Sequence, residues 1–387
     1  MPSGSLRTRL LGGIHEISAS QWDALFASPY PFIRHHYLAA LEQHGCVGGQ
    51  SGWEPAHLII EDAQGTLRAA APLYRKQHSY GEFVFDWAWA DASHRIGQPY
   101  YPKWLSAIPF VPATGPRLAY CDSSAQQALM EQLAALSEQD QASSCHLLFL
   151  PPDQAQSMRS NGFLLRNDIQ FHWRNHGYSD FDAFLSALSS AKRKKLRRER
   201  KRVSDQGISF EISDGSDLSQ TQWQRIFALY ANTYHERGMW PYLNLEFLHA
   251  LRAMPDRPLR LVLAYDGQEL VAMALNLRGG DRLYGRHWGA AANYDALHFE
   301  CCYYQGIEIC LREGLNHFDA GTQGEHKRSR GFEPVITHSL HRLRDPRLHD
   351  AVDRYLQQER AVVAARYEDL MQHTPYRQQT GEASTPD

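Results

Sequence analysis

Residues 260–291 read RLVLAYDGQELVAMALNLRGGDRLYGRHWGAA. Two apolar runs in this stretch flank Asp266-Gly267, a dipeptide that favours the tight turn of a β-hairpin. A second turn signal, Gly279-Gly280, precedes a third run of the same kind. The stretch therefore predicts three consecutive antiparallel strands, at 260–265, 270–277 and 282–288.

Helices are predicted on both sides of these strands. Upstream, apolar residues recur at helical spacing at Trp223, Ile226, Phe227, Tyr230 and Tyr234. Downstream, a nearly all-apolar helix is predicted over 296–313, ended by Gly314, and a strand follows at 317–319. This order indicates a mixed α/β class rather than a doubly wound nucleotide-binding fold. No GxGxxG opens a helix after a strand, and no Walker A sequence is present.

The two halves of the chain share an ordered set of short matches at nearly constant offset. The pairs are Gln21-Trp22 with Gln222-Trp223, 31–41 with 241–251, Leu67, Ala69 and Ala71 with Leu270, Ala272 and Ala274, and Trp87 with Trp288. A tandem duplication explains this order better than the short apolar patterns that any two α/β domains share. We therefore expect two copies of one unit, at 1–170 and 171–371, and a polar, disordered tail over 372–387.

The composition excludes several classes of protein. The chain of 387 residues is 43% hydrophobic and 21% charged, with a net charge of −3, so its overall field does not attract nucleic acid or anionic membranes. We expect no DNA binding. Because it has no secretory signal and no apolar run near the ~20 residues of a membrane span, we expect a cytoplasmic protein. Six cysteines without a CxxC pair indicate reduced, buried thiols, and neither disulfides nor a metal site.

The third predicted strand runs into a motif that suits a phosphate. Arg286, Gly289 and Ala291 fit the pattern Arg-x-x-Gly-x-Ala at the turn from strand into helix. Small residues there let backbone N–H groups approach a pyrophosphate, and the helix N-terminus adds a positive dipole end. Residues 85–89 of the first copy lack both the Arg and the Gly. We expect the second copy to react, with the first as scaffold and acceptor wall across a groove.

The densest set of polar residues follows the strand at 317–319. It forms a glycine-punctuated loop, in which a carboxylate or an imidazole suits proton transfer and cations suit an anionic ligand. A solvated surface loop is the alternative. The predicted proton acceptors are Glu325 and His326, with His287, His298 and Asp319 as weaker candidates. For His298, a buried and purely structural histidine is the alternative.

A basic run separates the two copies. A helix is predicted over 190–203, with a thin apolar stripe at Leu196 and Val203 and an intensely positive remainder. Ser179 with Asp182 is predicted to cap the helix before it. The positive face suits phosphates of a nucleotide-linked substrate or of RNA, and a merely solvated face is the alternative. The predicted phosphate-binding residues are Lys192, Arg193, Lys194, Lys195, Lys327 and Arg330.

Several of these motifs together resemble a bacterial FemAB-like family within the GNAT acyltransferase superfamily. The resemblance covers roughly Ile14 to Leu370. It is carried by 285–289, 297–304, 318–327 and 330–334, and by the basic segment at 190–200. It implies a tandem pair of GNAT-like domains, each with a central, mostly antiparallel sheet flanked by helices. It also implies direct transfer of an acyl group to an amine, without a metal.

The resemblance leaves the acyl donor open. In ordinary GNAT enzymes the loop at Arg286, Gly289 and Ala291 would hold the pyrophosphate of coenzyme A, which makes acyl-CoA a possible co-substrate. Here Asn293-Tyr294-Asp295 separates that loop from the helix. Peptidoglycan-type relatives use aminoacyl-tRNA instead. No tightly bound cofactor is expected with either donor.

The leading hypothesis is an N-acyltransferase acting on a small or nucleotide-linked amine. Glu325 or His326 deprotonates the amine, and backbone N–H groups near Gly289 stabilise the oxyanion. A second hypothesis is a non-catalytic module that binds RNA or a cell-wall precursor through the basic helix. A third is a GNAT enzyme that transfers acetyl from acetyl-CoA to a protein or small amine.

Overall fold

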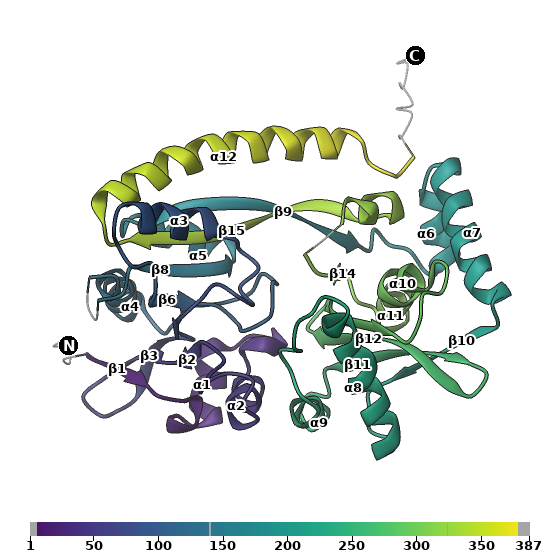
Figure 1. Ribbon diagram of the computed structural model, residues 1–387, viewed down its shortest axis with the longest axis horizontal. Helices are drawn as coiled ribbons and strands as arrows, with labels where there is room; N and C mark the ends of the chain where they lie inside the picture. The colour runs from purple at the N-terminus through teal and green to yellow at the C-terminus, as the bar shows by residue number, and fades with distance from the viewer. Residues whose placement is uncertain (1–5, 139–140, 323, 378–387) are drawn as a thin grey trace, which may run out of the picture.

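The computed structural model describes residues 6–138, 141–322 and 324–377. Its strands form one sheet of eleven, in the order β10-β11-β12-β13-β14-β9-β15-β8-β6-β5-β2, and a second sheet of four, in the order β1-β3-β4-β7. Only the pairs β13/β14 and β6/β8 in these sheets are parallel. Helices flank the sheets, and the longest, α12 (Pro346–Gln372), runs across both halves of the molecule (Figure 1). The predicted mixed α/β class with a mostly antiparallel sheet is confirmed.

The second half contains the strands that the sequence predicted. They are β11 (Leu259–Asp266), β12 (Glu269–Gly279), β13 (Arg282–Ala290) and β14 (His317–Asp319), and they follow a strand that the sequence did not predict, β10 (Ile208–Ser213). The strands β10 to β13 pair antiparallel in chain order. The predicted helix over 296–313 is a short α10 (Leu297–Phe299), a π-helical turn at Glu300–Tyr304 and α11 (Gln305–Glu313). Gly314 ends it in the left-handed conformation, as predicted.

The first half also contains antiparallel strands, but they are divided between the two sheets. Its strands are β1 (Arg7–Leu11), β2 (Trp53–Pro55), β3 (His57–Glu61), β4 (Leu67–Ala71), β5 (Tyr74–Lys76), β6 (Lys103–Ser106), β7 (Ala119–Tyr120) and β8 (Ser144–Leu150). The β3/β4 pair belongs to the small sheet, and the β2/β5 pair, which continues it, belongs to the large one.

The two halves exchange their last strands. β9 (Leu164–Arg174) ends the first half but pairs with β14 of the second. β15 (Glu333–Leu343) ends the second half but pairs with β8 of the first. β9 and β15 also pair with each other along nine residues, from Leu164↔His341 to His172↔Glu333. The predicted boundary between residues 170 and 171 falls inside β9, and the division into two sequential domains stays a prediction.

The helices support two of the four internal matches, and the third pairs strand β4 with strand β12. Trp22 in α1 (Ala19–Phe26) and Trp223 in α8 (Gln220–His235) are both fully buried against the strands of their own halves. The matched stretches 31–41 and 241–251 contain α2 (His35–Gln43) and α9 (Leu245–Arg252). The fourth match is wrong. Trp87 begins helix α3 (Trp87–Arg95), whereas Trp288 lies in a strand.

The remaining helices are α4 (Ser123–Leu136), α5 (Pro152–Arg159), α6 (Phe181–Ala187) and α7 (Ser190–Asp205), with short 3-10 turns at Ile14–Glu16, Pro31–Ile33 and Glu325–Arg330. The predicted basic helix is α7, and its stripe at Leu196 and Val203 is buried as expected. The predicted cap of α6 is wrong, because the Asp180 carboxylate accepts from the Ala183 N–H at 2.8 Å. Among the described residues no helix is both long and apolar enough to cross a membrane.

Disorder was predicted for residues 372–387, but residues 375–377, which follow α12, form hydrogen bonds with the rest of the protein. The backbone N–H of Arg377 donates to the Ala187 carbonyl, and the Ser189 N–H donates to the Pro375 carbonyl. The Tyr376 hydroxyl donates to the Gly331 carbonyl at 2.7 Å. Residues 378–387 of the predicted tail lie outside the described part of the chain. The prediction of buried thiols also fails at Cys121, which is exposed.

Candidate active site

A cavity of about 350 Å³ lies where the halves meet, and we call it the imidazole cavity. Phe83 of the first half closes one wall, and the rest is built from the second half. Its titratable walls include Arg286, His287, His298, His326 and Lys327. A larger hollow near Trp240 has one carboxylate in its lining, Glu42, and both oxygens of Glu42 accept hydrogen bonds from neighbouring groups. The imidazole cavity is therefore the better candidate for chemistry.

The structure places the predicted phosphate motif inside β13. β13 continues to Ala290, Gly289 pairs with Met273 of β12, and the Ala291 N–H donates to the Val271 carbonyl. A Cβ at Gly289 would lie 2.0 Å from the backbone oxygen of Leu229, so the glycine lets α8 pack on the strand. Gly289 and Ala291 therefore do not form the predicted loop. Arg286 does reach the cavity.

Burial and nearby cations keep the three cavity histidines neutral. Burial, then Arg286, lowers the pKa of His287 to about 3. Burial, then His326 and Arg330, lowers the pKa of His298 to about 4. The pKa of His326 is lowered by burial and by Arg330 as well. A neutral imidazole has a lone pair that accepts a proton, so all three have the protonation state of a general base near pH 7.

The hydrogen bonds of the three rings differ. The Tyr303 hydroxyl lies 2.8 Å from Nε2 of His326. Because burial raises the pKa of Tyr303, its hydroxyl keeps its proton and donates it to that nitrogen. The rings of His287 and His298 have no hydrogen-bond partner within the described ranges of the chain. His298 lies 6.3 Å from His326, centroid to centroid.

Two buried cations lie beside these imidazoles. Lys327 is 1% exposed and its ammonium donates to the Gly321 carbonyl. Burial, with Arg286 nearby, lowers the pKa of Lys327 to about 8 although Asp319 opposes the shift. The guanidinium of Arg286 lies 3.1 Å from the Asp319 carboxylate, Nη2 to Oδ1. Lys327, predicted as a phosphate ligand, thus lies at the floor of the cavity.

The predicted carboxylate candidates lie outside the cavity lining. Glu325 is two-thirds exposed and forms an ion pair with Arg366 on α12. Asp319 is buried behind Arg286 and accepts from the Gly321 N–H at 2.9 Å. Burial opposes its ionisation, but Arg286 and His172 outweigh burial and hold the pKa of Asp319 below its usual value. Asp319 is therefore an ionised partner of Arg286 and a poor base.

The predicted phosphate ligands fall into two groups. Arg330 is buried and its Nε and Nη2 donate to the two oxygens of Glu199 at 3.1 and 2.8 Å, so it joins the loop to α7 and faces no ligand. Lys195 donates to the Ser329 hydroxyl at 3.2 Å. The side chains of Lys192, Arg193 and Lys194 have no ion-pair partner among the described residues. These three cations remain available at the start of α7.

The sequence reasoning missed two features of the first half. A smaller cavity of about 180 Å³ adjoins the imidazole cavity and shares Phe83 and Thr322 with it. We call it the strand-pair cavity, since β9 and β15 supply much of its wall, including Gln170 and Ser339. No local signal reveals it, because it depends on the strand exchange.

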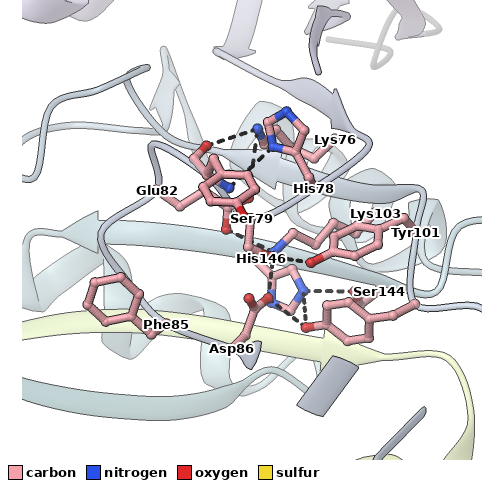
Figure 2. A network of polar contacts seen from close by, with 12 residues as sticks. Lys76, His78, Ser79, Glu82, Phe85, Asp86, Tyr101, Lys103, Ser144 and His146 are labelled. Carbon is pink, nitrogen blue, oxygen red and sulfur yellow. Dashed lines mark hydrogen bonds and ion pairs between the residues drawn. The ribbon is translucent and has the colours of Figure 1, made fainter. Parts of the chain in front are cut away.

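The second missed feature is a buried charged network, the Lys103 cluster, made of Lys76, Ser79, Glu82, Asp86 and Lys103 (Figure 2). The Lys103 ammonium donates to Ser79 at 2.7 Å, Glu82 at 2.8 Å and Asp86 at 2.5 Å. It anchors the segment that carries Phe83, whose φ is +62°. The signal in the sequence is lysine within short apolar runs, as in Lys103-Trp104-Leu105.

Comparison with known proteins identifies the family. A model of the FemAB-like family, described as peptidoglycan biosynthesis/recognition, matches residues 13–378. No curated protein sequence matches the chain.

Solved structures show the same fold. FemX shares 12% identity at a TM-score of 0.53, over 87% of this chain and 98% of that one. A conserved protein of unknown function from Bacteroides thetaiotaomicron VPI-5482 shares 10% at 0.51, over 86% and 98%. The C-terminal domain of a putative lysylphosphatidylglycerol synthetase from Agrobacterium fabrum shares 10% at 0.50, over 86% and 93%. Since the family match spans nearly the whole chain, the protein belongs to the FemAB-like family.

Proposed function

We propose that the protein transfers an acyl or aminoacyl group from an activated donor to an amine inside the imidazole cavity. One observation supports this most. Neutral imidazoles and buried cations share one cavity, without a carboxylate in the described part of its lining. Amine attack on an activated acyl group needs both a proton acceptor and positive charge near the developing oxyanion.

In this proposal His326 receives the proton of the amine through Tyr303. The amine nitrogen attacks the acyl carbon, and the bond from that carbon to the sulfur or oxygen of the donor breaks. The proton of the amine passes to the Tyr303 oxygen while the Tyr303 proton passes to Nε2 of His326, 2.8 Å away. His326 lies at the rim, where solvent or the leaving group takes the proton from it. His298 is the second candidate because its ring nitrogens are free.

Lys327 is the proposed stabiliser of the oxyanion. Its ammonium is buried in the cavity, and one of its three donors is used by Gly321. A fixed positive charge in a buried site stabilises developing negative charge more than the same charge in water. Lys327 takes the role that the sequence assigned to backbone N–H groups near Gly289.

The structure leaves both donors possible and favours a charged tRNA. Arg286, Gly289 and Ala291 suggested coenzyme A, but Arg286 and Gly289 lie in a strand that ends at Ala290, so the predicted loop does not support it. Lys192, Arg193 and Lys194, which lack ion-pair partners in the described structure, suit the phosphates of a polyanion. The family description, peptidoglycan biosynthesis/recognition, favours a peptidoglycan precursor as the acceptor.

The test supplies labelled acetyl-CoA and a labelled pool of aminoacyl-tRNA, each with a panel of amines that includes nucleotide-linked muramyl peptides. We expect label on an amine from one donor. Tyr303→Phe, which removes a single hydroxyl, and His326→Gln are both expected to lower transfer by ~10²–10⁴-fold. Full activity in both variants would refute the assigned base. Absence of transfer with every pair, together with tight, salt-dependent binding of RNA or the precursor, would instead support the non-catalytic module.

A further inference from the structure

Arg286 is a buried guanidinium whose hydrogen-bonding capacity is unused. Its side chain is 3% exposed and lines the imidazole cavity. Its Nε and Nη2 atoms are fully buried, and no hydrogen-bond partner for them exists among the described residues. The guanidinium carbon of Arg286 lies 5.6 Å from the centroid of the Phe32 ring, and its Nη2 atom lies 3.1 Å from Oδ1 of Asp319. Buried polar groups without partners are rare in folded proteins, and a missing ligand is one of their causes.

The charges around Arg286 do not balance. Arg286 and Lys327 are both buried, and Asp319, the ion-pair partner of Arg286, is also the carboxylate whose charge opposes the lowered pKa of Lys327. The neighbouring imidazoles of His172, His287 and His298 are neutral near pH 7, because burial is the largest cause that lowers the pKa of each. The cavity floor therefore has one positive charge in excess. Buried charges are normally paired, so this excess favours an anionic occupant.

Another arginine shows what a purely structural arginine looks like here. Arg330 is 2% exposed, like Arg286, but it donates to Glu199, Tyr304 and the His326 carbonyl. Both arginines contact an aromatic ring face, Arg330 over Phe299 at 3.5 Å. Arg330 therefore uses its donors in hydrogen bonds within the protein, whereas Nε and Nη2 of Arg286 have no hydrogen-bond partner among the described residues.

We infer that the substrate enters the imidazole cavity with an anionic group, a carboxylate or a phosphate, which binds to Arg286. Calling this molecule the amine acceptor rests on the proposed function. A guanidinium recognises such groups through parallel N–H···O bonds, and Lys327 adds a second positive charge. Asp319 holds the guanidinium in place from the other side, since the Gly321 N–H fixes its carboxylate at 2.9 Å. The cavity of about 350 Å³ has room for such a group and its amine.

The experiment uses the full chain and two small probes, sodium acetate and inorganic phosphate, at constant ionic strength. Calorimetric titration should show saturable binding of one probe, weakened at least tenfold in Arg286→Gln and less in Arg286→Lys. The probe that binds identifies the chemistry, carboxylate or phosphate. Arg278→Gln is the matched control, because Arg278 pairs with Glu313 away from the cavity. The Arg278→Gln variant should bind the probe as tightly as the unchanged protein does.

A second readout does not depend on affinity alone. Arg286 lowers the pKa of His287, so a bound anion should raise the apparent pKa of that histidine in a ¹³C-histidine NMR titration. The shift should vanish in Arg286→Gln, and thermal unfolding of each variant shows whether it is folded. Equal probe binding in the unchanged protein and a folded Arg286→Gln would overturn the inference, as would no binding of either probe. If a probe binds at Arg286 but no donor supports transfer, the anion site stands and the proposed function fails.

Discussion

Each half of the molecule buries a cluster built around a lysine, and the two clusters differ in how their charges are matched. In the first half, Lys103 and Lys76 face Glu82 and Asp86, and all three donors of Lys103 are used. In the second half, Lys327 and Arg286 share Asp319, and most of their donors are unused. The clusters occupy related places, since β6 and β13 are the parallel neighbours of β8 and β14.

This difference separates a structural network from a reactive one. The balanced cluster holds the segment with Phe83 in place, and a left-handed φ of +62° at Phe83 is kept only because its surroundings fix it. The unbalanced cluster lines a cavity and depends on a ligand for its missing charge. A buried lysine alone therefore does not indicate a functional site. The number of hydrogen-bond and charge partners around the lysine distinguishes a structural cluster from a reactive one.

The largest expected effect comes from breaking the balanced cluster. Lys103→Met leaves Asp86 buried without its cation and leaves Glu82 with only Lys76, at 4.0 Å, and we expect a loss of about 3–5 kcal/mol in the free energy of unfolding. Urea denaturation followed by circular dichroism measures this loss. The quadruple variant Lys76→Met, Lys103→Met, Glu82→Gln, Asp86→Asn removes the charges together and should recover much of the stability. A single variant as stable as the unchanged protein would contradict a structural role.

Breaking the unbalanced cluster should lower the rate of acyl transfer and leave the stability of the fold largely unchanged. Lys327→Met removes the cation beside the reacting group, and we expect acyl transfer to fall by about 10²–10³-fold. The fold should tolerate it, because the change reduces an excess of buried positive charge. Initial rates with the active donor measure the effect, and thermal unfolding is the control. A Lys327→Met variant that is clearly less stable but keeps its rate of transfer would reverse the comparison.

The pH dependence sharpens the contrast. The pKa of Lys327 is lowered to about 8 by burial, so its charge is lost as the pH rises through 8. Transfer should then fall tenfold per pH unit above 8. Lys103 should show no such loss, because Glu82 and Asp86 outweigh burial and raise its pKa. In Lys327→Arg the fall should move beyond pH 10. A rate that stays flat from pH 7 to 10 in the unchanged protein would exclude Lys327 from the transition state.

Stability should change with pH in the opposite sense at Lys327. The unfolded lysine has a pKa of 10.5 and the folded one about 8, so between these values the unfolded chain binds the extra proton. Stability therefore rises with pH across this window. The contribution should be absent in Lys327→Met.

The smallest expected effect concerns the unpaired cations at the start of α7. Lys192→Ala with Lys194→Ala should change the free energy of unfolding by less than about 0.5 kcal/mol, because neither side chain has an ion-pair partner in the described structure. If both contact phosphates, the slope of log affinity for charged tRNA against log salt should shrink by roughly 0.7–0.9 per lysine. An unchanged slope would show that α7 is only a solvated face.

Local patterns predicted the elements well. The hairpin at Asp266-Gly267 and the basic helix were readable because turn dipeptides and helical periodicity act over a few residues. The exchange of β9 and β15 was not readable, since strand pairing across the chain leaves no short-range signal. The match of Trp87 to Trp288 failed because residues 77–102 of the first half carry an added segment and helix.

The site was predicted by residue type more than by role. His287, His298, His326, Arg286 and Lys327 were all singled out, and the fold brings all five to one cavity. Glu325 was predicted as a proton acceptor alongside His326, but the sequence does not show that α12 passes near and supplies Arg366. Arg286 was chosen for a loop motif that lies in a strand. Its buried, partnerless state appears only in three dimensions.

The exchange of terminal strands also bears on how the chain is made. During synthesis β8 has β6 beside it, but its other neighbour, β15, ends 193 residues after β8 does, since Leu343 follows Leu150 by that distance. At the usual speed of a ribosome this delay is about 10–40 s. For that time the growing first half exposes an unpaired strand edge, a feature that promotes aggregation. The first half is thus a nascent chain in need of protection, and separating the halves at residue 170 would make that state permanent.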